Sequence, residues 1–388
     1  MSTSADTLAL LDRLVGFQSV AGHTNLPLMD FVETHLAGAG FACRRIASED
    51  GTRTNLFASI GPAERPGVVL SSHTDVVSTD EQDWSADPFR LRVEDGRAIG
   101  RGTTDMKGFL ASALRAAARA ATTELARPLH LALSYDEELG CVGVRRMIDT
   151  LGSLPPPSLC VVGEPTRMGA VIAHKGKLMG DIVCHGIPGH SSVPDVGINA
   201  IEIAADMVVA VRGIAAELRA AGRAPGFTVP FTTLHIGTIA AGRAVNLIPS
   251  LCRMAFEIRN APEDDVAAVL ARLEAAAADV ARSFPAGAAV EIVTTGSYPA
   301  FAIAPDSAAV ATVQRIAGTT GTQKVGYGTE AGLFQSELGW PAVVCGPGDV
   351  AQAHKADEFI ALSELAACDA FLDRLVDTLA DPAAARLS

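Results

Sequence analysis

A histidine and an aspartate two residues apart follow directly on an apolar run in the stretch PGVVLSSHTDVV. Alternate residues of an extended chain point to the same side, so His73 and Asp75 can reach one place. Either both side chains bind a common partner, or Asp75 holds the imidazole while His73 binds something else. On its own the pair also fits a surface turn with a polar histidine, so the rest of the chain must decide between these interpretations.

Four further stretches place acids or a histidine at the end of an apolar segment or in a glycine-rich loop. Taken singly, Asp105 fits a helix cap, and the glutamate pair fits a solvated acidic turn. Adjacent side chains diverge where a strand ends, so Glu137 and Glu138 can serve different roles close together. The residues are Asp105 in GRGTTDMKG, Glu137 and Glu138 in YDEELG, Glu164 in VVGEPT and His354 in GPGDVAQAHKADEF.

Strands that alternate with helices must position these side chains. Several of the expected strands are apolar throughout, which is typical of a largely parallel sheet covered on both faces. In open α/β sheets ligands bind at the carboxyl ends of the strands, where the polar residues above fall. We expect helices within residues 7–40 and over 106–121, and strands at 42–47, 55–61, 67–73, 128–138 and from 158 to a stop at Gly163.

The middle of the chain has a different order of elements. Strand, helix, two strands, helix and strand follow one another, which is the ferredoxin-like βαββαβ arrangement with helices on one face of an antiparallel sheet. After this segment the α/β pattern resumes. We therefore expect an α/β domain, residues 1–176 and 291–388, interrupted by an inserted βαββαβ domain over residues 177–290.

Histidine and carboxylates delivered to one sheet edge form a mixed nitrogen and oxygen donor set. Such donors suit zinc or cobalt, and also manganese, whereas the absence of clustered cysteines argues against a structural zinc site. The candidate ligands exceed the number that a single tetrahedral catalytic metal uses. A two-metal site with one shared carboxylate accommodates all of them and keeps a position open for water.

Composition excludes several classes of protein. The formal net charge of -13 argues against nonspecific nucleic-acid binding, which needs a basic face. The seven cysteines are scattered and form no C-x-x-C, which favours free thiols in a reducing cytoplasm. Neither a signal-peptide pattern nor an apolar run of about 20 residues is present, so we expect a soluble cytoplasmic protein without a membrane partner.

The ordered motifs together resemble the M20 family of dinuclear zinc aminoacylases and peptidases. They are SSHTDVV, GRGTTDMKG, DEELG, VVGEPT, GHSSVPDVGINAI and AHKADEF, and the similarity extends over essentially the whole chain in the same order. The family includes succinyl-diaminopimelate desuccinylases and acetylornithine deacetylases. The phrases YGTEAG and GPGDVAQAHKADEF are most similar to the acetylornithine deacetylase branch.

The resemblance implies two divalent metal ions, zinc first and cobalt as an alternative, and a role for each ligand. Asp105 would bridge both ions. Asp75 would accept the other ring N–H of His73 and fix its tautomer, and Glu137 would be the general base that takes a proton from the attacking water. The remaining ligands would be His73 and Glu164 on one ion and Glu138 and His354 on the other.

The resemblance also implies that the α/β domain is a zinc-peptidase-like catalytic domain and that the inserted domain is a lid and dimerisation domain, through which a homodimer forms. It further implies four residues that touch the substrate. His190 in GIPGHSSVP would stabilise the oxyanion, often in the partner subunit, although it also fits a helix cap. Arg259 in FEIRN would clamp an α-carboxylate with its planar fork, although a surface strand arginine is common. Asn246 in AVNLIPS and Thr329 in YGTEAG would line the site.

The function implied is hydrolysis of an N-acyl amino acid, with N-acetyl-L-ornithine as the expected substrate and arginine biosynthesis as the setting. Desuccinylation of a diaminopimelate derivative and dipeptide hydrolysis by the same machinery stay open, because the sequence does not resolve the acyl pocket. A metal-dependent binding protein without catalysis is a further alternative, but such a site has no need of Glu137 beside Glu138. The chain has no phosphate-binding G-x-x-x-x-G-K-[ST] motif and no serine-hydrolase G-x-S-x-G motif.

Overall fold

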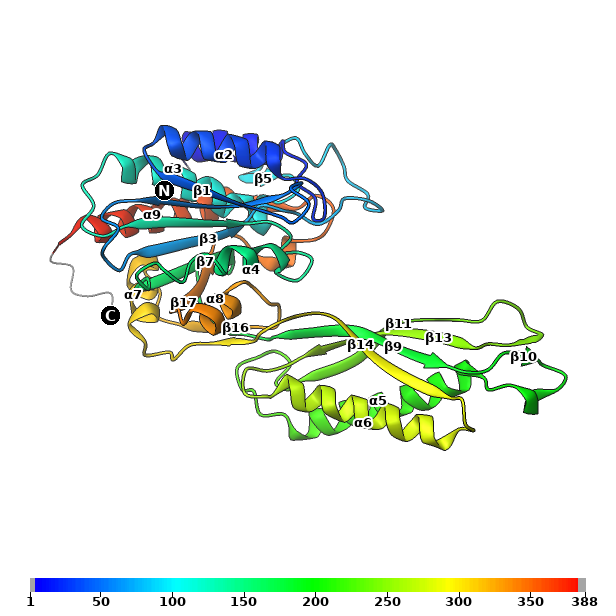
Figure 1. Ribbon diagram of the computed structural model, residues 1–388. Coiled ribbons are helices and arrows are strands. Elements are labelled where there is room, and N and C mark those ends of the chain that lie inside the picture. The colour runs from blue at the N-terminus through cyan, green and yellow to red at the C-terminus, as the bar shows by residue number, and fades with distance from the viewer. Residues whose placement is uncertain (1–3, 383–388) are drawn as a thin grey trace. The chain divides into compact units, whose positions relative to one another are not determined.

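The chain divides into two compact units, which a computed structural model describes over residues 4–382 (Figure 1). Unit 1 contains the chain up to Ile172, Ala302–Gln323 and the chain from Thr329 on, and unit 2 contains Ala173–Phe301 and Lys324–Gly328. Unit 2 is longer than the 177–290 segment expected from the sequence, because strand β14 (Ala289–Tyr298) continues well beyond residue 290.

Unit 1 is built on one mixed sheet in the order β1-β2-β6-β3-β7-β17-β8-β15, with β16 paired to β8. The central neighbours β6, β3, β7 and β17 are parallel, and the pairs β1–β2, β2–β6 and β8–β17 are antiparallel. This confirms the expected α/β class with a largely parallel centre. The strands are β1 (Ala42–Ala47), β2 (Thr54–Ile60), β3 (Val68–His73), β6 (Leu129–Ser134), β7 (Leu159–Pro165), β8 (Ala170–His174), β15 (Phe301–Ala302), β16 (Thr322–Val325) and β17 (Ala342–Gly346).

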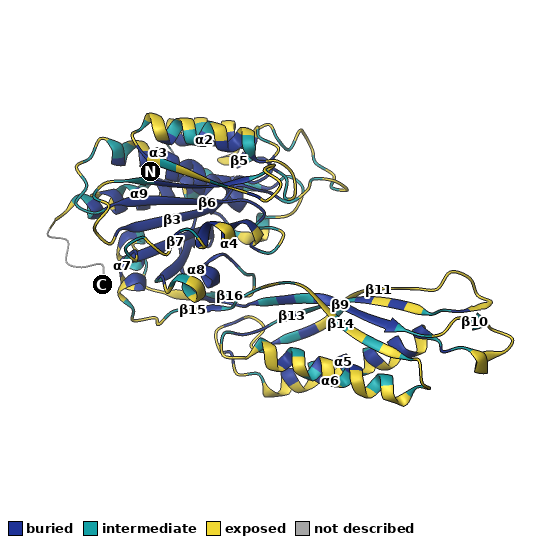
Figure 2. Cartoon of the chain, in the orientation of Figure 1, coloured by how far each residue is buried: buried dark blue, intermediate teal, exposed yellow. Residues whose placement is uncertain are grey.

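Helices cover both faces of this sheet, as Figure 1 shows. Strands β3, β6 and β7 are buried along their whole length, which explains why their sequences are mostly apolar (Figure 2). One face carries α1 (Ala5–Val15), α2 (Leu26–Gly38), α3 (Gly108–Ala121), α7 (Ala308–Ala317) and α9 (Leu362–Ala380), and the other carries α4 (Val142–Ile148) and α8 (Ala331–Leu338).

The sequence predicts that this strand stops at Gly163. In the structure, strand β7 continues through Glu164 to Pro165. A Cβ atom at Gly163 would lie 2.0 Å from Cδ1 of Phe109 on α3, so only glycine lets this helix pack directly on the strand. Glu164 is consequently a strand residue, and it is 5% exposed. Close packing of α3 therefore helps to place this carboxylate at the buried end of β7.

A small three-stranded sheet joins the chain segment before Asp105 to the segment after His354. Strand β5 (Arg97–Ile99) pairs with β4 (Arg92–Glu94) on one side and with β18 (Phe359–Ala361) on the other. β5 precedes Asp105 in the chain, and β18 follows His354. The pairing of β5 with β18 therefore brings these two distant segments side by side.

Unit 2 has the element order βαββαβ and an antiparallel sheet in the order β11-β13-β9-β14. Both of its long helices pack on one face of this sheet, around buried residues such as Ile182, Met207 and Met254. None of the helices between residues 4 and 382 has the length and apolar character needed to cross a membrane. The elements are β9 (Lys177–His185), β10 (Gly189–His190), α5 (Ala200–Ala221), β11 (Thr233–Ala241), β12 (Leu247–Ile248), β13 (Leu251–Arg259), α6 (Val266–Ser283) and β14.

Candidate functional site

The polar residues singled out in unit 1 gather at the carboxyl edge of its parallel strands. His73 is the last residue of β3, and Glu164 lies next to the end of β7. Glu137 and Glu138 lie in the loop after β6, and His354 lies in the loop after β17. Because β6, β3, β7 and β17 are neighbours in the sheet, these loops converge at one edge, where α/β sheets bind their ligands.

Asp105 stands between two histidines and presents a different carboxylate oxygen to each. Its Oδ1 lies 2.9 Å from Nε2 of His73, and its Oδ2 lies 3.2 Å from Nε2 of His354. A second carboxylate flanks each histidine: Glu164 Oε1 is 3.8 Å from His73 Nε2, and Glu138 Oε1 is 3.2 Å from His354 Nε2. The site thus consists of two donor sets that share Asp105.

These separations match what metal ligands require. Two donors about 2.0–2.2 Å from one tetrahedral zinc ion lie roughly 3.3 Å from each other, close to the observed 2.9–3.8 Å. Within residues 4–382 the ion pairs of Asp105, Glu138 and Glu164 are all with histidine, and none is with lysine or arginine. The donor set therefore fits two divalent cations with Asp105 shared between them.

The electrostatics of the two histidines follow from the same contacts. Burial alone would lower the pKa of His73, but hydrogen bonds with Asp105 and Asp75 raise it well above its usual value. Hydrogen bonds with Asp105 and Glu138 raise the pKa of His354 to about 10. His73 is 1% exposed and the side chain of His354 is 53% exposed, so the donor set around His354 is the more open one.

The histidine that ends β3 contacts Asp75 through its second ring nitrogen. The ring Nδ1 of His73 lies 2.9 Å from the backbone carbonyl oxygen of Asp75, whereas the Asp75 carboxylate is 3.6 Å away. A carbonyl oxygen only accepts hydrogen bonds, so Nδ1 carries the proton and Nε2 is left to bind a metal. The backbone carbonyl of Asp75 is thus the nearer acceptor of this N–H, and the expected role of the Asp75 carboxylate in fixing the tautomer stays a prediction.

The Asp75 carboxylate instead holds the loop of the glutamate pair. Its Oδ1 accepts the backbone N–H of Glu137 and its Oδ2 accepts that of Glu138, both at 3.1 Å. A charged acceptor on two consecutive amides makes strong hydrogen bonds and fixes the loop. Asp75 thus positions both glutamates through their main chain.

Glu137 lies close to two of the proposed metal ligands and also has a hydrogen-bond partner of its own, Cys141. Its donor atom lies within 4.8 Å of those of His73 and Glu164, and its Oε1 accepts a hydrogen bond from the Cys141 thiol at 3.3 Å. Burial raises the pKa of Glu137 well above its usual value, and the neighbouring Glu138 adds to this effect while His73 opposes it. A carboxylate that binds protons this readily is suited to take up and return a proton beside the metal ligands.

A cavity of about 640 Å³ opens in unit 1 beside Glu138. Its lining residues include Gln18, His23, Thr24 and Asp80, so it offers polar groups next to the ligand cluster. Its size is within the range of sites that hold small molecules. The cavity provides room for part of a substrate close to the donor sets.

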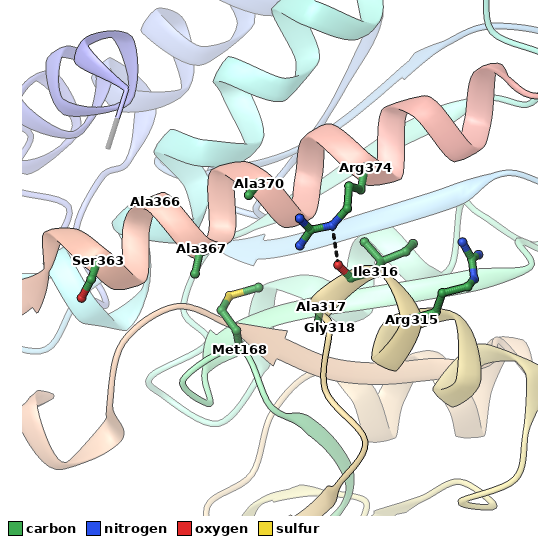
Figure 3. A pocket seen from close by; sticks show the side chains of 10 residues that line it. All are labelled: Met168, Arg315, Ile316, Ala317, Gly318, Ser363, Ala366, Ala367, Ala370 and Arg374. Atoms are coloured by element: carbon green, nitrogen blue, oxygen red, sulfur yellow. Dashed lines mark hydrogen bonds between the residues drawn. The ribbon is translucent and has the colours of Figure 1, made fainter. Parts of the chain in front are cut away.

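A second cavity, of about 590 Å³, lies between α7 and α9 and has no part in this chemistry (Figure 3). Histidine and acidic residues are absent from its lining, which lies wholly within the described residues. The Nε–H of Arg374 donates to the carbonyl oxygen of Ile316 at 2.6 Å and so fastens α9 to the last turn of α7. We assign this arginine a structural role.

In unit 2 the structure brings His190 and Asn246 together. β10 pairs with β12 so that His190 stands opposite Leu247, and the N–H of Ser191 donates to the carbonyl oxygen of Asn246 at 3.1 Å. The ring Nδ1 of His190 accepts the N–H of Ser192 at 3.1 Å. Because an amide N–H only donates, the neutral imidazole carries its proton on Nε2 and offers it as a hydrogen-bond donor.

Arg259 is already engaged. Its Nε–H donates to Oε1 of Glu257 at 2.7 Å and its Nη2 to Oε2 at 3.2 Å, and Lys177 pairs with the same glutamate at 3.2 Å. The planar fork that the sequence assigns to a substrate carboxylate is therefore held by a neighbour two residues away on β13. A substrate carboxylate would have to share or displace Glu257.

The YGTEAG segment contributes a residue that the sequence did not single out. Thr329 is fully buried, and its hydroxyl oxygen accepts the N–H of Ala331 at the start of α8. Its neighbour Glu330, 1% exposed, reaches the strands instead, where its Oε2 accepts the Ser71 hydroxyl at 2.9 Å. A glutamate followed by an apolar helix, as in TEAGLF, was the available signal for a buried acid.

Glu330 should make folding depend on pH in a testable way. Burial raises its pKa to about 7, so between about pH 4.5 and pH 7 the folded protein binds a proton that the unfolded chain has lost. Stability of the metal-free protein should therefore fall over this interval, by about 3 kcal/mol from this residue. We expect the stability of Glu330→Gln relative to the wild type to rise by about this amount as the pH increases from 5 to 8. Urea denaturation of both metal-free proteins measures this difference. Parallel curves for the two proteins would contradict the assignment.

The two donor sets share one carboxylate and lie beside a proton acceptor, at the carboxyl edge of an α/β sheet. This is the arrangement of a metallohydrolase. The model of the peptidase family M20/M25/M40 matches residues 69–378. This chain therefore belongs to that family, and it is a hydrolase.

Individual relatives agree with this assignment. The chain is 34% identical over 382 residues to the acetylornithine deacetylase of Myxococcus xanthus. The alignment covers 96% of this chain and 98% of the relative. An M20 family metallo-carboxypeptidase from Sulfolobus solfataricus has the same fold, with a TM-score of 0.79 at 18% identity over 97% of this chain and 99% of that one. A tripeptidase from Staphylococcus aureus gives a TM-score of 0.78 at 19% identity, over 98% and 99% of the two chains.

Proposed function

We propose that this protein is a metal-dependent amidohydrolase that removes the acyl group from an N-acyl amino acid, with N-acetyl-L-ornithine as its substrate. The observation that carries the proposal is Asp105, which presents one oxygen to each of two histidine–carboxylate sets. The choice of substrate is supported by the acetylornithine deacetylase of Myxococcus xanthus, which aligns over nearly the full length of both chains. Such an enzyme would serve arginine biosynthesis.

Each residue of the site would have a distinct task. Two divalent ions, zinc or cobalt, would polarise the scissile carbonyl and acidify the attacking water when bound by these ligands. Glu137 would take the proton of that water and return it to the departing amine. Asp75 keeps Glu137 in place through its backbone N–H, and Cys141 orients the carboxylate by its hydrogen bond to Oε1.

Three residues of unit 2 would take part in the proposed chemistry. His190 would donate its Nε2–H to the oxyanion, a role that its hydrogen bond from Ser192 supports by leaving Nε2 protonated. Arg259 would bind the substrate α-carboxylate in exchange for part of its pairing with Glu257. Asn246 would lie beside His190 as a further polar contact, in keeping with their neighbouring backbones.

We further propose that two copies associate through unit 2. Strand β11 is an edge strand, and the apolar side chains of Val209 on α5 and Ile239 on β11 are 65% and 59% exposed. Pairing of two such edges would satisfy free backbone groups and cover these side chains. Cytoplasmic action is supported by the cysteines, all seven of which are free thiols.

A substrate screen tests the proposed function. The purified protein, loaded with zinc or cobalt, should hydrolyse N-acetyl-L-ornithine faster than N-succinyl-L,L-diaminopimelate, N-formyl amino acids or dipeptides. Preference for the succinyl compound would transfer the protein to the desuccinylase branch, and preference for dipeptides would make it a dipeptidase. Turnover of none of these compounds by protein with bound metal would favour a binding protein.

Replacement of His190 should lower the turnover of the enzyme more than its substrate binding. We expect His190→Ala to lower kcat by about 10² or more, because an oxyanion donor acts chiefly in the transition state. Ser192→Ala, which keeps the backbone N–H on Nδ1, serves as the matched control and should lose far less.

Mixed dimers then decide which subunit His190 serves. If His190 acts on the partner subunit, combining inactive His190→Ala and inactive Glu137→Gln subunits should restore activity in the mixed dimer. Mass spectrometry of the intact dimers confirms that subunits have exchanged. Confirmed mixed dimers without activity would rule out action across the dimer.

A further inference from the structure

Glu358 is a buried carboxylate on which four hydrogen-bond donors converge. Its Oε1 accepts the backbone N–H groups of Thr104 and Asp105, at 2.9 and 3.1 Å. Its Oε2 accepts the N–H of Gly102 at 2.9 Å and Nη1 of Arg101 at 2.7 Å. All four donors belong to residues 101–105, the segment that ends at Asp105, and Glu358 itself is 1% exposed.

Main-chain contacts strengthen the same connection. The N–H of Gly100 donates to the carbonyl oxygen of Glu358 at 2.9 Å, and the hydroxyl of Thr104 donates to the carbonyl oxygen of Phe359 at 2.6 Å. These bonds continue the pairing of β5 with β18 up to the aspartate. The segment before Asp105 is therefore attached along its length to the segment that contains Glu358.

A second path runs from Arg101 to the loop of His354. Nη2 of Arg101 donates to the side-chain oxygen of Gln82, and the Gln82 amide donates to the carbonyl oxygen of His354 at 3.3 Å. Arg101 is as deeply buried as Glu358, so its charge is matched by this glutamate inside the protein. Glu358 thus connects the main chain of one proposed ligand, Asp105, with that of another, His354.

We propose that Glu358 is a positioning residue for both metal ions, acting by holding Asp105 and His354 in register. This inference rests on the proposed two-ion site. Asp105 must aim its two oxygens at different histidines, and the main chain that sets this direction is held by the Glu358 carboxylate. Glutamine cannot replace it, because its single side-chain oxygen would serve the donors of one side and its NH₂ group would face N–H donors on the other.

Metal binding by the metal-free protein tests the proposal. Cobalt is titrated into wild type, Glu358→Gln and Glu358→Ala, with calorimetry for the affinities and the visible absorption of bound cobalt for ligand geometry. We expect both variants to bind both ions about 10–100-fold more weakly than the wild type, with an altered cobalt spectrum. Wild-type affinities and an unchanged spectrum in Glu358→Gln would overturn the proposal.

Asp369→Asn is the matched control. Asp369 is also a buried acid of unit 1, 7% exposed, and it pairs with Arg115 at 3.2 Å and with the Thr7 hydroxyl at 2.9 Å. Its partners are separate from the ligand loops, so this variant should lose stability but keep its metal affinity. An equal loss of metal affinity in Asp369→Asn would show that general destabilisation is the cause and would overturn the proposal.

If both Glu358 variants fail to fold, Gln82→Ala tests the positioning network in their place. Gln82 lies near the surface and belongs only to the outer path, so its removal should weaken chiefly the ion next to His354. Unchanged binding of both ions in Gln82→Ala would then contradict the positioning network. The two proposals fail separately: a wild-type protein that does not bind two ions overturns the two-ion site, whereas two tightly bound ions in Glu358→Gln overturn only the role of Glu358.

Discussion

Glu137→Gln should keep both metal ions and lower kcat about 10²–10⁴-fold, the factor that general acid–base catalysis typically contributes. Glutamine has nearly the shape of glutamate and can still accept the hydrogen bond of Cys141. It cannot take a proton from water at neutral pH, however, so the chemical step alone should suffer. Steady-state kinetics together with metal analysis of the same preparation measure both quantities.

The neighbouring glutamate supplies the control for this prediction. Glu138 lies 3.2 Å from Nε2 of His354, so Glu138→Gln should weaken metal binding as well as activity. Both variants alter one member of the same loop, which Asp75 holds by two backbone N–H groups. If Glu137→Gln lost its metal while Glu138→Gln kept its metal and lost turnover, the two assignments would have to be exchanged.

Asp105→Ala should abolish tight binding of both ions and with it all measurable activity. The variant removes an oxygen from each donor set at once, and it leaves His73, Glu164, Glu138 and His354 without the group between them. No other single replacement at the site is expected to act on both ions directly. Metal content after dialysis, measured by mass spectrometry of the elements, gives the stoichiometry.

Replacement of either histidine should have a narrower effect. His73→Ala should weaken chiefly the ion shared with Glu164, and His354→Ala chiefly the ion shared with Glu138. The side chain of His354 is 53% exposed, so its ion should also be the first that a chelator removes from the wild type. An Asp105→Ala protein that retained two tightly bound ions would contradict the assignment of Asp105 as the shared ligand.

The main features of unit 1 could be predicted because they are local in the sequence. Strands β3, β6 and β7 are buried along their whole length and mostly apolar, and His73 and Glu164 stand at or next to the ends of β3 and β7. Parallel neighbours then bring their carboxyl ends to one edge without further information. The order of elements in unit 2 follows in the same way from the alternation of strand and helix patterns.

The remaining features depend on contacts between residues far apart in the chain. Nothing near Asp75 indicates that its carboxylate accepts the N–H groups of Glu137 and Glu138, some sixty residues later. Glu358 lies more than 250 residues from its partners in the Asp105 segment. A pattern of residue types cannot reveal such hydrogen bonds, because they are created by the packing of strands and loops that the sequence orders only coarsely.

Arg259 illustrates a different limit. Its type and place on a strand predict a carboxylate clamp, and the fork does hold a carboxylate, that of Glu257 on the same strand. The preference of a guanidinium group for a carboxylate therefore predicts the type of partner correctly. The sequence alone does not distinguish a substrate carboxylate from that of a neighbour two residues away. Pairs at this spacing point to the same side of a strand and compete with any ligand.

Anomalous diffraction from crystals of the zinc-loaded protein tests the two-ion site most directly. We predict two peaks at the zinc edge on either side of Asp105, about 3.5–4 Å apart as in other two-metal sites. One should lie between His73 and Glu164, and the other between Glu138 and His354. A single peak at full zinc loading, or two peaks of which neither contacts Asp105, would contradict this account of the site.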